Sequence, residues 1–162
     1  MGGTGRPRES PARGAQAGHN RERAMKDYAR DILLRVATQA ESFLRGNHDR
    51  FRSIILEVEV MPEECFEKRC KWPHPTPAIY LGYPSLRWRF FPTLLGMHEI
   101  MAAGKFKVDS FDSAAEAVDR LMKEAERHAE EIGKECHASI RVAAFQRGGE
   151  FVFLPKEIFE TN

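Results

Sequence analysis

Two cysteines and a histidine lie close together in the sequence, at Cys65, Cys70 and His74, and could bind zinc. Thiolate sulfur and imidazole nitrogen are ligands that zinc prefers, but a structural zinc site needs four of them. Four residues separate the two cysteines, which is the upper limit of the common spacing. The alternative is that both thiols are small hydrophobic groups and the histidine is a loop residue. We therefore keep these residues as weak metal candidates and predict no cofactor.

The cysteine count also bears on the compartment. The chain has three cysteines, Cys65, Cys70 and Cys136, and no apolar stretch follows its basic N-terminus as in a secretory signal. An odd count without an export signal indicates reduced thiols, although a Cys65–Cys70 bridge is sterically conceivable. No apolar run approaches the roughly 18 residues that span a bilayer. These features predict a cytoplasmic protein with no membrane partner.

Histidines beside acidic or sulfur side chains are the remaining candidates for catalysis. His98-Glu99 begins like a zinc-protease motif, but residue 102 is alanine where that motif needs a second histidine. Cys136 and His137 are neighbours in a predicted strand, so their side chains point to opposite faces and cannot act as a nucleophile–base pair. His128 lies within the apolar stripe of a predicted helix, which indicates a core or core-edge histidine. The chain is predicted not to be an enzyme, and a Cys/His active site is the third hypothesis.

Arginines alternate with aromatic residues in Arg87-Trp88-Arg89-Phe90-Phe91. Arginine neutralises phosphate and aromatic rings stack on bases, so this run suits nucleic-acid binding. Alternate residues of a strand share a face, however, which places Trp88 in the core and Arg87, Arg89 and Phe91 on the opposite face. The simplest outcome is therefore a buried tryptophan and two solvated arginines, which could pair across strands with Glu57 and Glu59. An exposed Phe91 is the argument for a binding surface.

The N-terminal segment adds to the nucleic-acid hypothesis. The formal net charge is only +1, but residues 1–22 are rich in glycine, proline, serine, alanine and arginine and lack large apolar side chains after Met1. Such a segment buries too little surface to fold, so a disordered basic tail is predicted. In this alternative hypothesis, the nucleic-acid contacts are Arg6, Arg8, Arg13, Lys71, Arg87 and Arg89.

Residues 61–92 contain six of the nine prolines and both tryptophans. The proline-rich part is expected to adopt a stiff polyproline II conformation, beside which Trp72 could anchor a protein partner. The alternative is that Trp72 folds back onto the core. Our leading hypothesis is a non-catalytic protein-binding accessory module, an adaptor, chaperone or inhibitor, that acts as a monomer or homodimer. The predicted partner contacts are Trp72, Tyr80, Tyr83, Arg87, Arg89 and Phe91.

The spacing of apolar residues along the sequence predicts the helices and strands that position these candidate residues. Apolar residues at helical spacing predict long helices over about 24–45 and from a capping box at Ser113 to Gly133, with a short helix over 93–103. Ile54, Leu56, Val58 and Val60 alternate with Glu57 and Glu59, which predicts a strand over 51–60 that is buried on one face only. A hairpin is predicted around Tyr83-Pro84-Ser85 and a second one around Arg147-Gly148-Gly149, and KEIFE could add a final helical turn. The prediction is an α+β domain over residues 23–162. It has an antiparallel sheet of about five strands, with two long helices and one short helix packed on it, in the order α-β-β-β-α-α-β-β.

Overall fold

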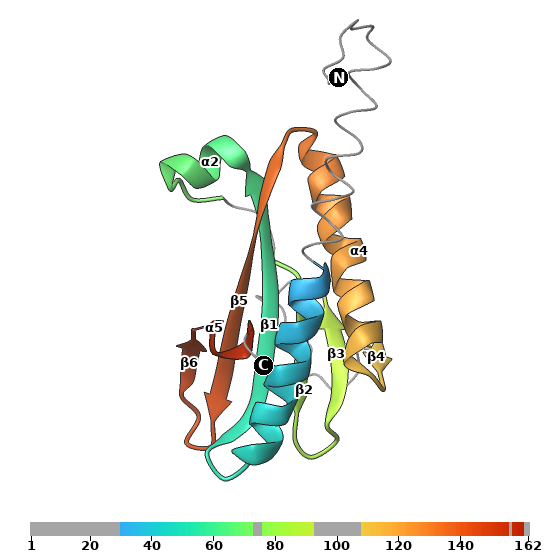
Figure 1. Ribbon diagram of the computed structural model, residues 1–162, viewed down its shortest axis with the longest axis vertical. Helices are drawn as coiled ribbons and strands as arrows, with labels where there is room; N and C mark the ends of the chain where they lie inside the picture. Colours follow the sequence, from blue (N-terminus) through green and yellow to red (C-terminus); the bar gives the residue numbers. More distant parts are fainter. Residues whose placement is uncertain (1–29, 73–75, 93–107, 156, 161–162) are drawn as a thin grey trace, which may run out of the picture.

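The computed structural model describes residues 30–72, 76–92, 108–155 and 157–160. Six strands form one antiparallel sheet in the order β4-β3-β2-β1-β5-β6 (Figure 1). Their bounds are β1 Phe51–Pro62, β2 Ala78–Gly82, β3 Arg87–Phe91, β4 Ser110–Phe111, β5 Cys136–Gln146 and β6 Phe151–Leu154. The predicted α+β class and antiparallel sheet are confirmed. The strand number differs because β4 has two residues, too few to show a period in the sequence.

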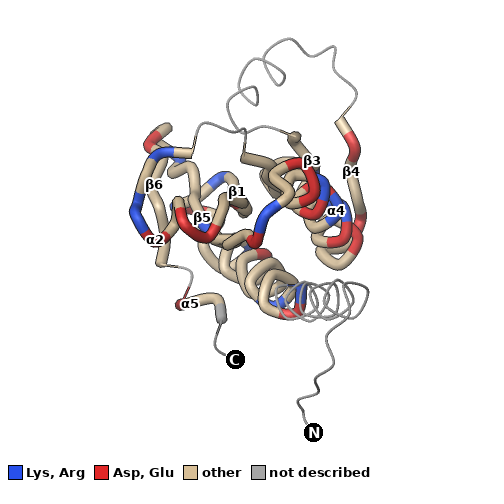
Figure 2. The backbone as a smooth tube through the Cα atoms, turned by 90° about the horizontal axis from the view of Figure 1, so that it is seen from above, with Lys and Arg blue, Asp and Glu red and all other residues tan. Residues whose placement is uncertain are grey.

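Helices in the described residues run over 30–46, Glu63–Lys68 (α2), Ala114–Ile132 (α4) and Glu157–Glu160 (α5). The helix over 30–46 and α4 lie on the same face of the sheet (Figure 2). Two predicted segments, the tail over 1–22 and the helix over 93–103, lie outside the described residues. The short helix α2 was not predicted, because its six residues follow Pro62 in a segment read as an irregular proline-rich connection.

The main core lies between the long helices and the sheet. The β1 residues Ile54, Leu56, Val58 and Val60 all belong to it, as their alternation predicted. The expectation that β1 is buried on one face only is wrong, because Ile55 and Glu57 on the other face are also buried. As the strand between β2 and β5, β1 is flanked on both sides, and a second apolar cluster covers its other face. That cluster comprises Ile55, Ala78, Tyr80, Phe91 and Phe145.

The signals that end the elements agree with the structure. The Ser113 hydroxyl accepts a hydrogen bond from the Glu116 backbone N–H at 3.2 Å, which confirms the capping box of α4. Gly133 ends that helix with a φ of 72°, a left-handed conformation that glycine adopts without steric cost. Both predicted hairpins are present, joining β2 to β3 and β5 to β6. The final helical turn is α5, whose Phe159 is buried in the main core.

Candidate functional site

Most of the residues predicted to contact a partner lie in the β2–β3 hairpin. Trp88 is 1% exposed and belongs to the main core, as strand alternation predicted. Tyr80 and Phe91 point to the other face but are only 9% and 0% exposed, and their rings meet edge to face with centroids 6.3 Å apart. The expectation of an exposed Phe91 is therefore wrong, because the second apolar cluster covers this part of the face.

The two arginines of β3 have partners within the structure. Arg87 forms an ion pair with Asp112, and the Arg89 guanidinium donates to the Ser85 hydroxyl at 3.5 Å. Neither side chain pairs with the glutamates of β1, because β2 lies between the two strands. These contacts tie β3 to its own turn and to the residues around β4. Binding of a partner by Arg87 and Arg89 stays a prediction.

Three further predicted contact residues lie outside the hairpin strands. Tyr83 is half-buried, and the Arg147 guanidinium lies 5.5 Å from its ring centroid. Trp72 is half-buried and Lys71 is exposed, next to residues 73–75, which lie outside the described part of the chain. Part of the surface of Trp72 and Tyr83 is thus accessible, and their partner role also stays a prediction.

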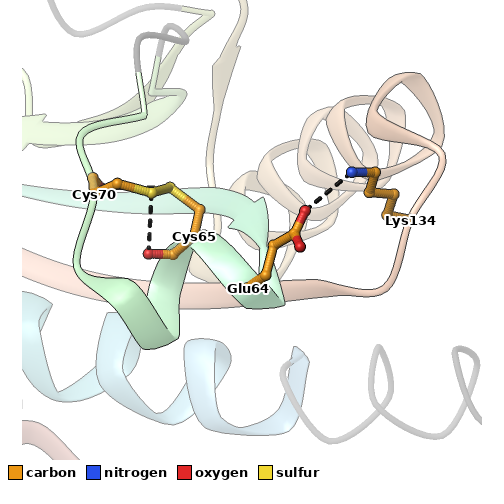
Figure 3. Close-up of a disulfide and its surroundings, with 4 residues drawn as sticks. All are labelled: Glu64, Cys65, Cys70 and Lys134. Atoms are coloured by element: carbon orange, nitrogen blue, oxygen red, sulfur yellow. Dashed lines mark hydrogen bonds and ion pairs between the residues drawn. A yellow bond between two sulfur atoms is a disulfide. The ribbon is translucent and has the colours of Figure 1, made fainter.

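A disulfide joins Cys65 within α2 to Cys70, which lies two residues after the end of that helix (Figure 3). The same helix is held to the end of α4 by an ion pair between Glu64 and Lys134, whose Nζ and Oε1 atoms are 3.0 Å apart. The expectation of reduced thiols is therefore wrong for Cys65 and Cys70, because their two sulfur atoms are bonded to each other. Disulfide sulfurs have no thiolate charge to offer zinc.

The candidates for catalysis are spread over the fold. His128 is buried with its Nε2 atom 3.4 Å from the Glu124 carboxylate, which agrees with a core-edge histidine. His137 stacks on Phe66 with ring centroids 3.5 Å apart, whereas the neighbouring Cys136 packs against the main core. His74, the His98-Glu99 pair and the tail arginines lie outside the described residues.

One surface that the sequence did not single out lies at β6. We use the name aromatic edge surface for Phe145, Phe151 and Phe153. The side chains of Phe151 and Phe153 are 40% and 60% exposed, and successive ring centroids are 5.1 Å apart from Phe145 to Phe151 and from Phe151 to Phe153. Val152 and Leu154 point the other way and pack against the main core. All four residues of β6 are apolar, so the sequence predicts a strand but does not show which face is left uncovered.

The backbone of β6 presents an open edge. Among the described strands, β6 pairs only with β5 and is the last strand of the sheet (Figure 1). The Gln146 N–H donates to the Glu150 carbonyl at 2.8 Å, so these two residues form a hydrogen-bonded pair of the antiparallel ladder. Such pairs alternate along a ladder, which makes Val152 the next residue of β6 bonded to β5. The N–H and C=O groups of Phe151 and Phe153 therefore point outward.

Arginines surround the aromatic edge surface. A register shift between Phe51 and Ser53 marks a β-bulge at Arg52, whose guanidinium lies 5.8 Å from the Phe145 ring centroid. The Arg141 guanidinium lies 5.9 Å from the Phe153 ring centroid. Arg52 has no ion pair within the described residues, so its positive charge is available to an acidic group of a partner.

Arg141 also pairs with the only buried carboxylate on this face within the described residues, that of Glu57. Glu57 is 3% exposed, and desolvation of its carboxylate raises the pKa above the ordinary value of 4.5. The positive charge of Arg141 acts in the opposite direction and lowers that pKa. The buried carboxylate thus fixes Arg141 beside Phe153.

This raised pKa predicts a pH dependence of stability. The contribution of Glu57 to the free energy of unfolding is fully present below its unfolded pKa and is lost as the pH rises through the folded pKa. The free energy of unfolding of the wild type minus that of Glu57→Gln should therefore fall as the pH is raised from about 4 to about 7 in urea titrations. Glu64→Gln is the matched control, because Lys134 lowers the pKa of Glu64. The corresponding difference should rise as the pH is raised toward the ordinary value of 4.5 and stay level above it. A flat or rising difference for Glu57 would contradict this account of the site.

No protein-family model, curated protein or solved structure matches this chain. Within the described ranges, no helix is long and apolar enough to cross a membrane. The same part of the chain has no group of three His, Cys, Asp or Glu side chains that could hold a metal ion. Of the four large apolar side chains that are exposed in the described residues, two, Phe151 and Phe153, belong to the aromatic edge surface.

Proposed function

We propose that this chain is a non-catalytic protein-binding module, and that it binds its partner through the aromatic edge surface and the open edge of β6. The observation that supports this proposal is the exposure of Phe151 and Phe153 where the backbone groups of the strand also point outward. Exposed apolar patches are typical of interaction sites, and large aromatic side chains often dominate their binding energy. An adaptor, chaperone or inhibitor would use such a surface.

The segment over 61–92 has a different part in this proposal from the one its composition suggested. Tyr80 and Phe91 lie on the same face as the aromatic edge surface and pack in one cluster with Phe145. In this proposal, Tyr80 and Phe91 pack inside the protein in the cluster that contains Phe145, and they do not contact the partner. A partner extending across the face would reach Arg89 at the far side, because Arg89 is paired in register with Tyr80 on β2.

Nucleic-acid binding is the second candidate, favoured by one observation. Exposed aromatic rings beside arginines on a sheet face can stack on the bases of a single strand. The rings here are poorly oriented for that, since Phe151 and Phe153 are at 89° and Phe145 and Phe151 at 65° to one another. They do not offer a row of parallel faces, whereas irregular apolar surface suits a protein partner.

Site-specific photo-crosslinking tests the proposed function. A photoreactive phenylalanine analogue at position 153 should crosslink a protein from a lysate of the source cells. The same analogue at Lys123, an exposed position on α4, is the matched control and should give no such product. Equal products from both positions, or crosslinks at position 153 to nucleic acid alone, would contradict the proposal.

A further inference from the structure

We infer that the partner adds to β6 as an extended peptide strand, with an acidic side chain at the end beside Phe151. This inference rests on the proposed function and gives the chemistry of the partner. Strand addition to a sheet edge derives affinity from main-chain hydrogen bonds and specificity from alternate side chains. The aromatic edge surface offers both.

The hydrogen bonds come from the outward groups of two residues. Gln146 and Glu150 form a hydrogen-bonded pair of the β5–β6 ladder, and such pairs alternate with non-bonded pairs. Phe151 and Phe153 therefore occupy non-bonded positions, and each directs one N–H and one C=O away from β5. Their side chains are also the two most exposed positions of the strand. A peptide residue paired with Phe151 or Phe153 would place its side chain on the same face as the phenylalanine rings. Alternate peptide residues would thus contact the aromatic edge surface.

The length of the edge favours a peptide over a second copy of this chain. The four residues of β6 extend over roughly 13 Å. A stable interface between folded proteins normally buries at least about 1,000 Å², which so short a strand pair does not supply alone. A peptide needs no larger surface, because it can lie along the edge and reach over the neighbouring rings.

The charge on the surface favours an acidic peptide. Arg52 lies over Phe145, which is directly opposite Phe151 in the register. The described residues give Arg52 no ion pair, with Glu150 or with any other acidic side chain. A carboxylate of the peptide near Phe151 would therefore meet an uncompensated cation.

The experiment uses the full-length chain, a displayed library of random short peptides and two matched variants. Selected peptides should alternate apolar residues with others and carry Asp or Glu near one end. Phe153→Ala should weaken the binding of a selected synthetic peptide about tenfold, the loss typical of a contact aromatic. Phe153→Pro removes the same ring and also the outward N–H, so it should weaken binding by roughly a further threefold to tenfold. Arg52→Gln should weaken binding and reduce its dependence on salt.

Several outcomes would overturn the inference, and thermal melting of each variant checks that it is folded. Equal affinities of Phe153→Ala and Phe153→Pro would exclude strand addition, while the crosslink at position 153 would still support a protein-binding surface. Selected peptides without acidic residues would exclude the charge recognition. Binding of an oligothymidine probe that Phe153→Ala and Arg52→Gln both weaken would point to single-stranded nucleic acid instead. A concentration-dependent dimer that Phe153→Pro abolishes would identify a second copy as the occupant.

Discussion

Trp88→Ala should lower the free energy of unfolding by about 3–5 kcal/mol, the cost expected for truncating a large buried aromatic side chain. Trp88 is the second residue of β3 and lies between Leu81 of β2 and Phe111 of β4 in the register. Its indole N–H donates to the Glu41 carboxylate at 3.1 Å, so the side chain also joins the sheet to the helix over 30–46. Urea titration of both proteins measures the difference.

Trp88→Phe separates the two contributions of this side chain. It keeps an aromatic ring in the core but loses the indole N–H and part of the volume, so we expect a smaller loss of about 1–3 kcal/mol. A loss below about 1 kcal/mol for Trp88→Ala would contradict the burial of Trp88. It would also reverse the assignment of the hairpin faces, and with it the placement of Arg87 and Arg89.

The second large effect is expected at the neighbour of the exposed phenylalanines. Val152→Pro should lower the free energy of unfolding by about 1–3 kcal/mol more than Val152→Ala does. The reason is that the Val152 N–H points toward β5, where its removal leaves the carbonyl of the buried residue Ala144 without its donor. Urea titration of the two variants gives this difference.

Phe153→Pro is the contrasting variant one residue further along. Its lost N–H points away from β5, so Phe153→Pro and Phe153→Ala should have the same stability to within about 0.5 kcal/mol. The opposite pattern, with the proline penalty at residue 153 and none at residue 152, would mean that Val152 presents the outward groups. The proposed strand addition would then lack its hydrogen-bond donors.

Local sequence patterns predicted most of the fold. The alternation in β1, the capping box at Ser113 and the Gly-Gly turn between β5 and β6 each fix a short stretch of backbone through interactions within a few residues. The two elements that were missed, α2 and β4, are six and two residues long. Tertiary contacts hold such short elements in place, for example the ion pair between Glu64 and Lys134.

The candidate site was harder to predict, because exposure depends on the order of strands in the sheet. Phe91 and Phe153 look alike in the sequence, since each lies in a short strand that is rich in aromatic residues. Phe91 packs against Tyr80 of the neighbouring β2, whereas Phe153 lies on an edge strand with a neighbour on one side only. Sequence composition therefore pointed to residues 61–92, whereas the exposed phenylalanines of the open strand edge are Phe151 and Phe153.

Amide hydrogen exchange of β6, with and without a selected peptide, tests the central claim most directly. In the free protein, the Phe151 and Phe153 amides should exchange freely while the Val152 amide is protected by its bond to β5. Bound peptide should slow exchange at Phe151 and Phe153 by at least about tenfold and leave Val152 little changed. Protection that appears elsewhere on the sheet, with Phe151 and Phe153 still exchanging freely, would contradict binding at this edge.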